Sequence, residues 1–123
     1  MLVASFNPGY QRGFKELKPS TRQRFIAVSF EYPEPKIEIE ILVNETKIDA
    51  DTAKKLVAIG NKIRNLTELG LTETVSTRLL IDAAKIIHSG LPKRLSVHAA
   101  VVEPLSDDLQ TVQALKDLCD LMI

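Results

Sequence analysis

The sequence contains no tryptophan, one cysteine and few aromatic residues, which make up 5% of its 123 residues. Because Cys119 has no partner in the chain, no internal disulfide can form, and cysteine usage gives no indication of secretion. No apolar run approaches the roughly 20 residues that a membrane-spanning helix needs. The N-terminus also lacks the charged and then apolar pattern of a signal peptide. These absences predict a soluble, cytoplasmic protein without a membrane span.

Net charge of either sign is also absent, since 16 basic residues balance 16 acidic ones. This balance, with so few aromatic residues, disfavours a nucleic-acid binder. The charges are nevertheless unevenly placed, because residues 1–24 carry five basic groups against one acidic group. Phosphates or an acidic protein surface are the natural partners of such a segment.

Hydrophobic residues make up 45% of the chain, and their spacing predicts two short strands followed by about five helices. The strands are expected at 2–6 and 25–30, joined by a basic loop at 10–24 with one helical turn around Arg22. The helices are expected at 35–45, at 51–66 with Asp49 or Asp51 as the cap, at 75–89 before Gly90, from Pro92 to before Pro104, and after a cap at Ser106 or Asp107. The fold class is therefore mainly α.

The histidine and cysteine residues indicate neither a metal site nor a reactive thiol. His88 and His98 are ten residues apart with no cysteine pair near them, so a metal site is not expected. Cys119 falls on the apolar face of the last predicted helix, where a free cysteine usually serves as a small hydrophobic residue.

Three positions remain as candidate binding or catalytic residues. Asn7 ends the first predicted strand, where an amide can orient water or touch phosphate, although a turn asparagine is the simpler interpretation. Arg22 and Arg24 directly precede the second strand and suit phosphate recognition, or else belong to a solvated basic loop. Arg78 lies in the first turn of the strongest helix, where a cation opposes the helix macrodipole unless an anion is near.

Four segments of the chain carry distinctive motifs: residues 4–10 (Ala-Ser-Phe-Asn-Pro-Gly-Tyr), 17–25 (Leu-Lys-Pro-Ser-Thr-Arg-Gln-Arg-Phe), 76–78 (Ser-Thr-Arg) and 101–108 (Val-Val-Glu-Pro-Leu-Ser-Asp-Asp). In this order they resemble the CbbQ/NirQ/NorQ group of MoxR-type AAA+ ATPases. The first resembles its sensor 1 strand, the second its arginine-finger segment, the third its sensor 2, and the fourth a C-terminal signature of the group. The resemblance covers essentially the whole chain and corresponds to the part of the ATPase from sensor 1 to the C-terminus.

The resemblance implies residue roles and a domain division. Asn7 would position the attacking water, Arg24 would reach the γ-phosphate of ATP in a neighbouring subunit, and Arg78 would contact the nucleotide from the lid. Residues 1–33 would be the remnant of the α/β core, and residues 34–123 the helical lid. In that fold another strand separates the two strands of this chain, so we expect each to lose its ladder partners while the helices pack together on their own.

The sequence departs from the family pattern in having no G-x-x-x-x-G-K-[ST] phosphate loop and no strand ending in an Asp-Glu pair before Asn7. We therefore expect a C-terminal fragment that does not hydrolyse ATP alone, with ATP and Mg²⁺ bound only by the intact parent ATPase.

The resemblance also implies partners for that parent. They are neighbouring subunits of a ring, a protein with a von Willebrand factor A domain, and a target metalloenzyme such as nitric oxide reductase or Rubisco, which the parent would activate as a chaperone. The alternative is a non-catalytic helical module that docks an acidic partner through residues 10–24.

Overall fold

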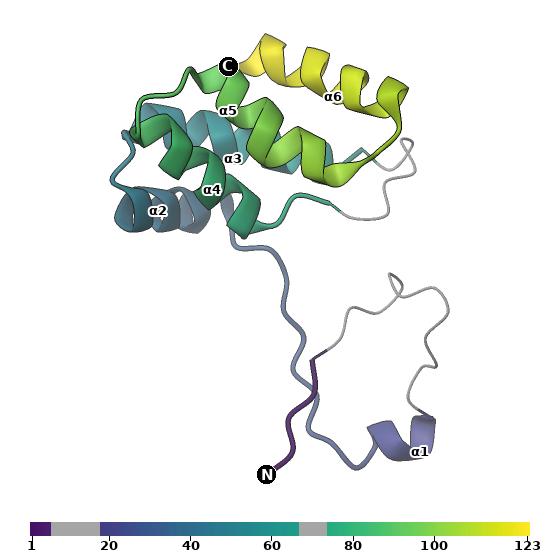
Figure 1. Cartoon of the computed structure of the whole chain (residues 1–123). Coiled ribbons are helices and arrows are strands. Elements are labelled where there is room, and N and C mark those ends of the chain that lie inside the picture. Colours follow the sequence, from purple (N-terminus) through teal and green to yellow (C-terminus); the bar gives the residue numbers. More distant parts are fainter. Residues whose placement is uncertain (6–17, 67–73) are drawn as a thin grey trace. The chain divides into compact units, whose positions relative to one another are not determined.

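A computed structural model of the chain describes residues 1–5, 18–66 and 74–123 (Figure 1). The chain divides into two compact units, Met1–Glu31 and Tyr32–Ile123, and each is described by itself. In the described ranges no helix is both long enough and apolar enough to cross a membrane.

In residues 1–5 and 18–31, the described part of the first unit, there is one short helix, α1 (Pro19–Arg22), which confirms the helical turn predicted around Arg22. The strands predicted at 2–6 and 25–30 are not observed, because residues 2–5 and 25–30 have no regular secondary structure. A strand is stable only when its backbone pairs with a neighbour. Neither segment finds such a neighbour among the described residues, and the side chains of Ile26 and Phe30 are 97% and 92% exposed.

All regular structure in residues 32–66 and 74–123 of the second unit is helical, which confirms the mainly α fold class. Its elements are α2 (Pro35–Thr46), α3 (Ala50–Arg64), α4 (Thr77–His88), α5 (Lys93–Val97), the π-helix η1 (His98–Val102), the 3₁₀ helix η2 (Glu103–Leu105) and α6 (Leu109–Met122). The ambiguous segment at 35–45 is thus a helix, with Pro35 in its first turn as predicted.

Helix ends follow local capping chemistry, with two departures from prediction. Asp49 caps α3 by accepting a 2.9 Å hydrogen bond from the Thr52 backbone N–H, which settles the choice between Asp49 and Asp51. The cap of α6 is Asp108, which accepts from the Thr111 N–H at 3.0 Å, so the predicted Ser106 or Asp107 is wrong. An N-cap side chain must reach the N–H three residues ahead, and Asp108 has that register.

The helix that follows Pro92 also extends further than predicted. Helical backbone continues from α5 through η1 into η2, which contains Pro104 in its first turn. Pro104 has no N–H to donate, so regular helical hydrogen bonding does not continue beyond it, and the chain leaves the helical run after the single 3₁₀ turn Glu103–Leu105. Gly90, with φ of 112°, ends α4 in a conformation that favours glycine, as predicted.

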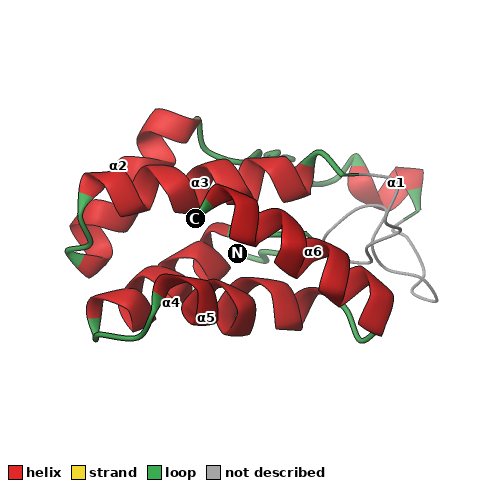
Figure 2. Ribbon diagram, turned by 90° about the horizontal axis from the view of Figure 1, so that it is seen from above, coloured by secondary structure: helices red, strands yellow, loops and turns green. Residues whose placement is uncertain are grey.

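Helix α4 is central to the second unit, since it packs against α2, α3, α5 and η1. In Figure 2, α2 and α3 run along one side of the unit and α4 and α5 along the other. Gly60 on α3 allows a close approach, because a Cβ atom there would lie 3.0 Å from Cδ1 of the fully buried Leu80. Cys119 is also buried, and burial, with a smaller effect of the Asp120 charge, raises the pKa of its thiol to about 11.

Truncation of the fully buried Leu80 side chain tests the packing between α3 and α4. Leu80→Ala is expected to lower the free energy of unfolding by about 2–5 kcal/mol, because it empties space between α3 and α4. Leu109→Ala is the control, since the Leu109 side chain is 84% exposed, and it should have little effect. Urea unfolding followed by circular dichroism measures both, and equal effects would contradict the packing described.

Candidate functional site

Arg78 lies in the first turn of α4 and is exposed. Ser76 caps the helix, its hydroxyl accepting from the Leu79 N–H at 3.4 Å, and the first turn contains no acidic residue. Within the described ranges, no hydrogen bond or ion pair involves the Arg78 guanidinium. The first turn of α4 thus places a cation at the positive end of the helix dipole and, among the described residues, gives it no ion-pair partner; an anionic ligand would relieve the unfavourable interaction.

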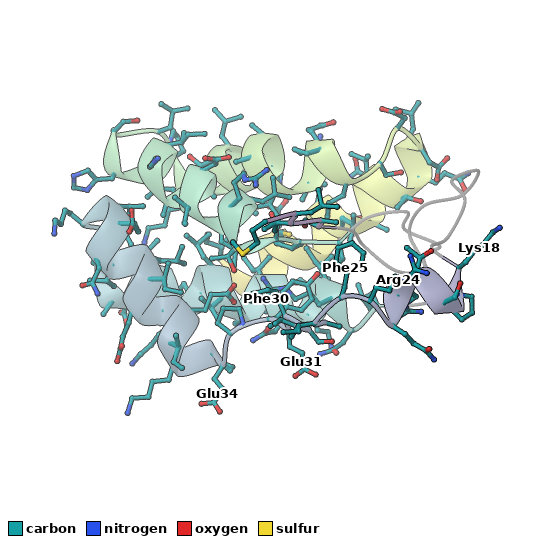
Figure 3. The ribbon with its side chains drawn as sticks, turned by 90° about the horizontal axis from the view of Figure 1, so that it is seen from below. Lys18, Arg24, Phe25, Phe30, Glu31 and Glu34 are labelled. Atoms are coloured by element: carbon teal, nitrogen blue, oxygen red, sulfur yellow. The ribbon has the colours of Figure 1, made fainter. Side chains whose placement is uncertain are left out.

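Arg24 belongs to the first unit, and its side chain is exposed. It follows α1 closely, and its backbone N–H donates to the Thr21 carbonyl at 3.1 Å. Figure 3 shows Lys18 and Arg24 on either side of α1. Arg24 and Arg78 are each described within their own unit, and Asn7 lies outside the described residues.

A buried ion pair lies next to the start of α4. Glu38 on α2 is fully buried, and its carboxylate receives two hydrogen bonds of 2.9 Å from the two terminal nitrogens of Arg64 at the end of α3. The Arg64 side chain is 6% exposed. Such a two-pronged arrangement of guanidinium and carboxylate is the strongest geometry for this pair.

The remaining donors of Arg64 bind neighbouring groups. Its Nε donates to the Val75 carbonyl at 2.7 Å, and one terminal nitrogen also donates to the Asn61 side chain at 3.1 Å. The ring of Tyr32 lies over the guanidinium, 4.0 Å from its carbon to the ring centroid. The buried charge thus has the hydrogen-bond partners and the cation–π contact that offset its loss of water.

Thr77 connects this ion pair to α4. Its hydroxyl donates to Oε2 of Glu38 at 2.6 Å, so the carboxylate accepts bonds from both α3 and the first residue of α4. Burial raises the pKa of Glu38, but the hydrogen bonds from Arg64 and Thr77 and the charge of Arg64 together hold it below its ordinary value. Glu38 is therefore ionised at neutral pH and joins three helices at one point.

Comparison with known proteins shows relatives over the whole chain. The sequence profile described as CbbQ/NirQ/NorQ C-terminal matches residues 38–122. The chain belongs to the CbbQ/NirQ/NorQ family. This membership confirms the resemblance drawn from the four motifs to the C-terminal part of that AAA+ group.

Three members of the CbbQ/NirQ/NorQ family illustrate the similarity. The denitrification regulatory protein NirQ of Pseudomonas aeruginosa is 50% identical over 123 residues, 100% of this chain and 47% of that protein. NorQ of Paracoccus denitrificans is 48% identical over 118 residues, 96% of the chain and 44% of the relative. CbbQ of Hydrogenophilus thermoluteolus is 44% identical over 115 residues, which are 94% of this chain and 43% of that relative. The chain spans less than half the length of these relatives.

The Glu38–Arg64 pair lies inside the range matched by the family's C-terminal profile, which begins at Glu38, but sequence reasoning missed it. One signal was present: Glu38 is four residues before the buried Leu42 and eight before the buried Thr46, so a carboxylate occupies a buried helical stripe. A charged residue on such a stripe indicates a buried partner. Nothing in the sequence identified Arg64, 26 residues away, as that partner.

Neutralising the carboxylate tests the ion pair. Glu38→Gln is expected to lower the free energy of unfolding at pH 7 by about 3–5 kcal/mol, because it leaves the charge of Arg64 buried without compensation. Since the folded pKa of Glu38 lies below its ordinary value of 4.5, its contribution is present above that pH and is lost as pH falls through the folded value. The difference between wild type and variant should therefore narrow below about pH 4.5.

The control for this experiment is Glu40→Gln, which changes an exposed carboxylate on the same helix. Hydrogen bonds from Thr52 and Thr111 lower the pKa values of the capping carboxylates Asp49 and Asp108. These two carboxylates are present in every variant, so their contributions to the pH dependence of stability cancel when variants are compared. Urea unfolding between pH 7 and pH 3 measures the difference. A difference that stays constant over this range would mean that the charge of Glu38 does not stabilise the fold.

Proposed function

We propose that the protein carrying this chain is a ring-forming AAA+ ATPase of the cytoplasm that acts as a chaperone-like activator of a metalloenzyme. Its relatives include proteins named as denitrification regulators, CbbQ, and a putative chaperone BssE of Thauera aromatica that is 26% identical over 115 residues. The motif resemblance implies a target of the nitric oxide reductase or Rubisco type and a helper protein with a von Willebrand factor A domain.

The observation that carries this proposal is the exposed guanidinium of Arg78 at an anchored helix start, which has no hydrogen-bond or ion-pair partner among the described residues. Arg78 is exposed, the first turn of α4 offers it no acidic partner, and the adjacent Thr77 is fixed to the buried Glu38. Phosphate groups are the natural ligands of such a position. In the intact ATPase, Arg78 would contact the phosphates of ATP from the lid.

Arg24 and Asn7 complete the proposed set of residues. The exposed Arg24 would reach the γ-phosphate of ATP in the neighbouring subunit and stabilise the charge that develops during transfer, while Asn7 would position the attacking water. Phosphoryl transfer depends mainly on positioning and charge stabilisation, and these side chains suit both tasks.

Magnesium is not assigned to any of these residues. In the described ranges, no three His, Cys, Asp or Glu side chains are close enough to hold a metal ion. No step of the proposal depends on Mg²⁺.

The second candidate function is a helical module that docks an acidic partner through residues 10–24. The exposure of Lys18, Arg22 and Arg24 favours it. The two functions differ in one measurable respect, because only the first requires ATP turnover to depend on a single arginine in this segment.

Arg24→Ala in the full-length ATPase is expected to leave ATP affinity nearly unchanged and to reduce turnover by about 10³–10⁵-fold, the effect of losing an arginine finger. Arg22→Ala is the matched control, since Arg22 is also an exposed arginine of the same segment, and it should retain most activity. Mixing the Arg24 variant with subunits defective in the phosphate loop should restore part of the turnover. Equal losses of affinity and turnover would assign Arg24 a structural role instead.

Arg78→Ala in the full-length ATPase is expected to weaken ATP binding about tenfold to a hundredfold, the effect of removing one hydrogen bond to a charged group. The fold should survive, because the side chain is exposed. Lys85→Ala, an exposed cation near the other end of α4, is the control. Calorimetric titration and thermal unfolding measure both effects. A loss of stability as large as that of Leu80→Ala would contradict the assignment.

A further inference from the structure

We infer that Thr77 is a positioning residue that orients Arg78 toward the phosphates of ATP by bonding to the buried carboxylate of Glu38. This inference rests on the proposed function, because it requires Arg78 to contact the nucleotide. The observation that carries it is the 2.6 Å hydrogen bond from the Thr77 hydroxyl to Glu38 Oε2, a contact between α4 and α2 across 39 residues of sequence.

The start of α4 depends on contacts from outside the helix. Its own side-chain cap, the bond from the Leu79 N–H to the Ser76 hydroxyl, is long at 3.4 Å. The two residues that flank Ser76 are held more closely: Val75 accepts a 2.7 Å bond from Arg64, and Thr77 donates its 2.6 Å bond to Glu38. Both external anchors therefore belong to the Glu38–Arg64 ion pair.

These two anchors fix the backbone from which the next side chain extends. Val75 is fully buried and Thr77 half-buried, whereas Arg78 is exposed. Because Cα–Cβ directions in a helix follow from the backbone, fixing residues 75–77 also fixes the direction of the Cα–Cβ bond of Arg78. A side chain that starts from a fixed backbone loses less conformational entropy when it meets its ligand than one on a mobile helix end.

The ion pair also leaves the charge of Arg78 available. The carboxylate of Glu38 accepts hydrogen bonds from both terminal nitrogens of Arg64 and from the hydroxyl of Thr77. Thr77 thus ties α4 to a carboxylate whose charge is already balanced by Arg64. The anchoring and the binding of phosphate are therefore carried out by different side chains.

A double-mutant cycle in the full-length ATPase tests this inference. Thr77→Val removes the hydroxyl but keeps the shape of the side chain, and it should weaken ATP affinity about twofold to tenfold. Thr77→Ser keeps a hydroxyl and should restore affinity to near the wild-type value. In the Arg78→Ala background, Thr77→Val should have no further effect on ATP affinity, because Thr77 acts through Arg78.

Thr111→Val is the matched control, since Thr111 also donates its hydroxyl to a carboxylate, that of Asp108 at 2.7 Å, at the start of another helix. It should not change ATP affinity. Calorimetry measures affinity and thermal unfolding measures the fold of each variant. Thr77→Ala removes the same hydroxyl and replaces Thr77→Val in the cycle if the latter does not fold.

The outcomes separate the inference from the proposed function. Suppose that Arg78→Ala weakens ATP binding. If Thr77→Val alone then leaves ATP affinity unchanged, or if it weakens affinity as much in the Arg78→Ala background as in the wild type, the positioning role is wrong while the proposed function stands. If the Thr77→Ser variant binds ATP as weakly as the Thr77→Val variant, the hydroxyl does not determine ATP affinity and the inference fails. If Arg78→Ala leaves ATP affinity unchanged, the proposed contact with the nucleotide fails, and the positioning role fails with it.

Discussion

The ion pair between Glu38 and Arg64 determines how three helices of the second unit meet. Removing a carboxylate and a guanidinium from water costs several kcal/mol each, and their attraction offsets this cost only when the other polar atoms are also satisfied. Here Thr77, the Val75 carbonyl and the ring of Tyr32 complete the arrangement. The pair therefore imposes a geometry: α2, α3 and the start of α4 must meet in this arrangement, or a buried charge is left unpaired.

This constraint relates the core to the proposed site. The apolar contacts of α4, such as that between Leu80 and Gly60, bring the helix against its neighbours but are non-directional. Hydrogen bonds from Thr77 and to Val75 specify where its first turn begins. The phosphate contact proposed for Arg78 in that first turn would benefit from such directional bonds, because phosphate recognition depends on the orientation of the guanidinium.

Local sequence signals predicted most of the helices. Helical spacing of residues such as Leu56 and Leu80 identified α3 and α4, and Pro35 marked the start of α2. The strand at 25–30 was predicted from β-branched and aromatic residues, yet a strand depends on a partner, and none exists among the described residues. The ion pair between Glu38 and Arg64 could not be predicted from the sequence either, because no local signal joins Glu38 to a guanidinium 26 residues later. Of the candidate site residues, Arg78 was proposed from its helix position and stays a prediction, whereas the side chains that anchor the start of α4 were not predicted.

The π-helix at His98–Val102 has a consequence for variation within this region. A π-helical turn bonds each N–H one residue further back than an α-helical turn does, so it accommodates one more residue between two helical segments. Deleting one residue between Val97 and Glu103 would remove this extra residue and allow an α-helical turn, with the helical segments on either side kept in nearly the same register. The buried side chains of α6 would then keep their partners, whereas deleting one residue within α3 or α4 would rotate the rest of that helix by about 100°. Homologous chains that keep this packing are therefore expected to accept a one-residue gap in the π-helical segment more readily than within α3 or α4.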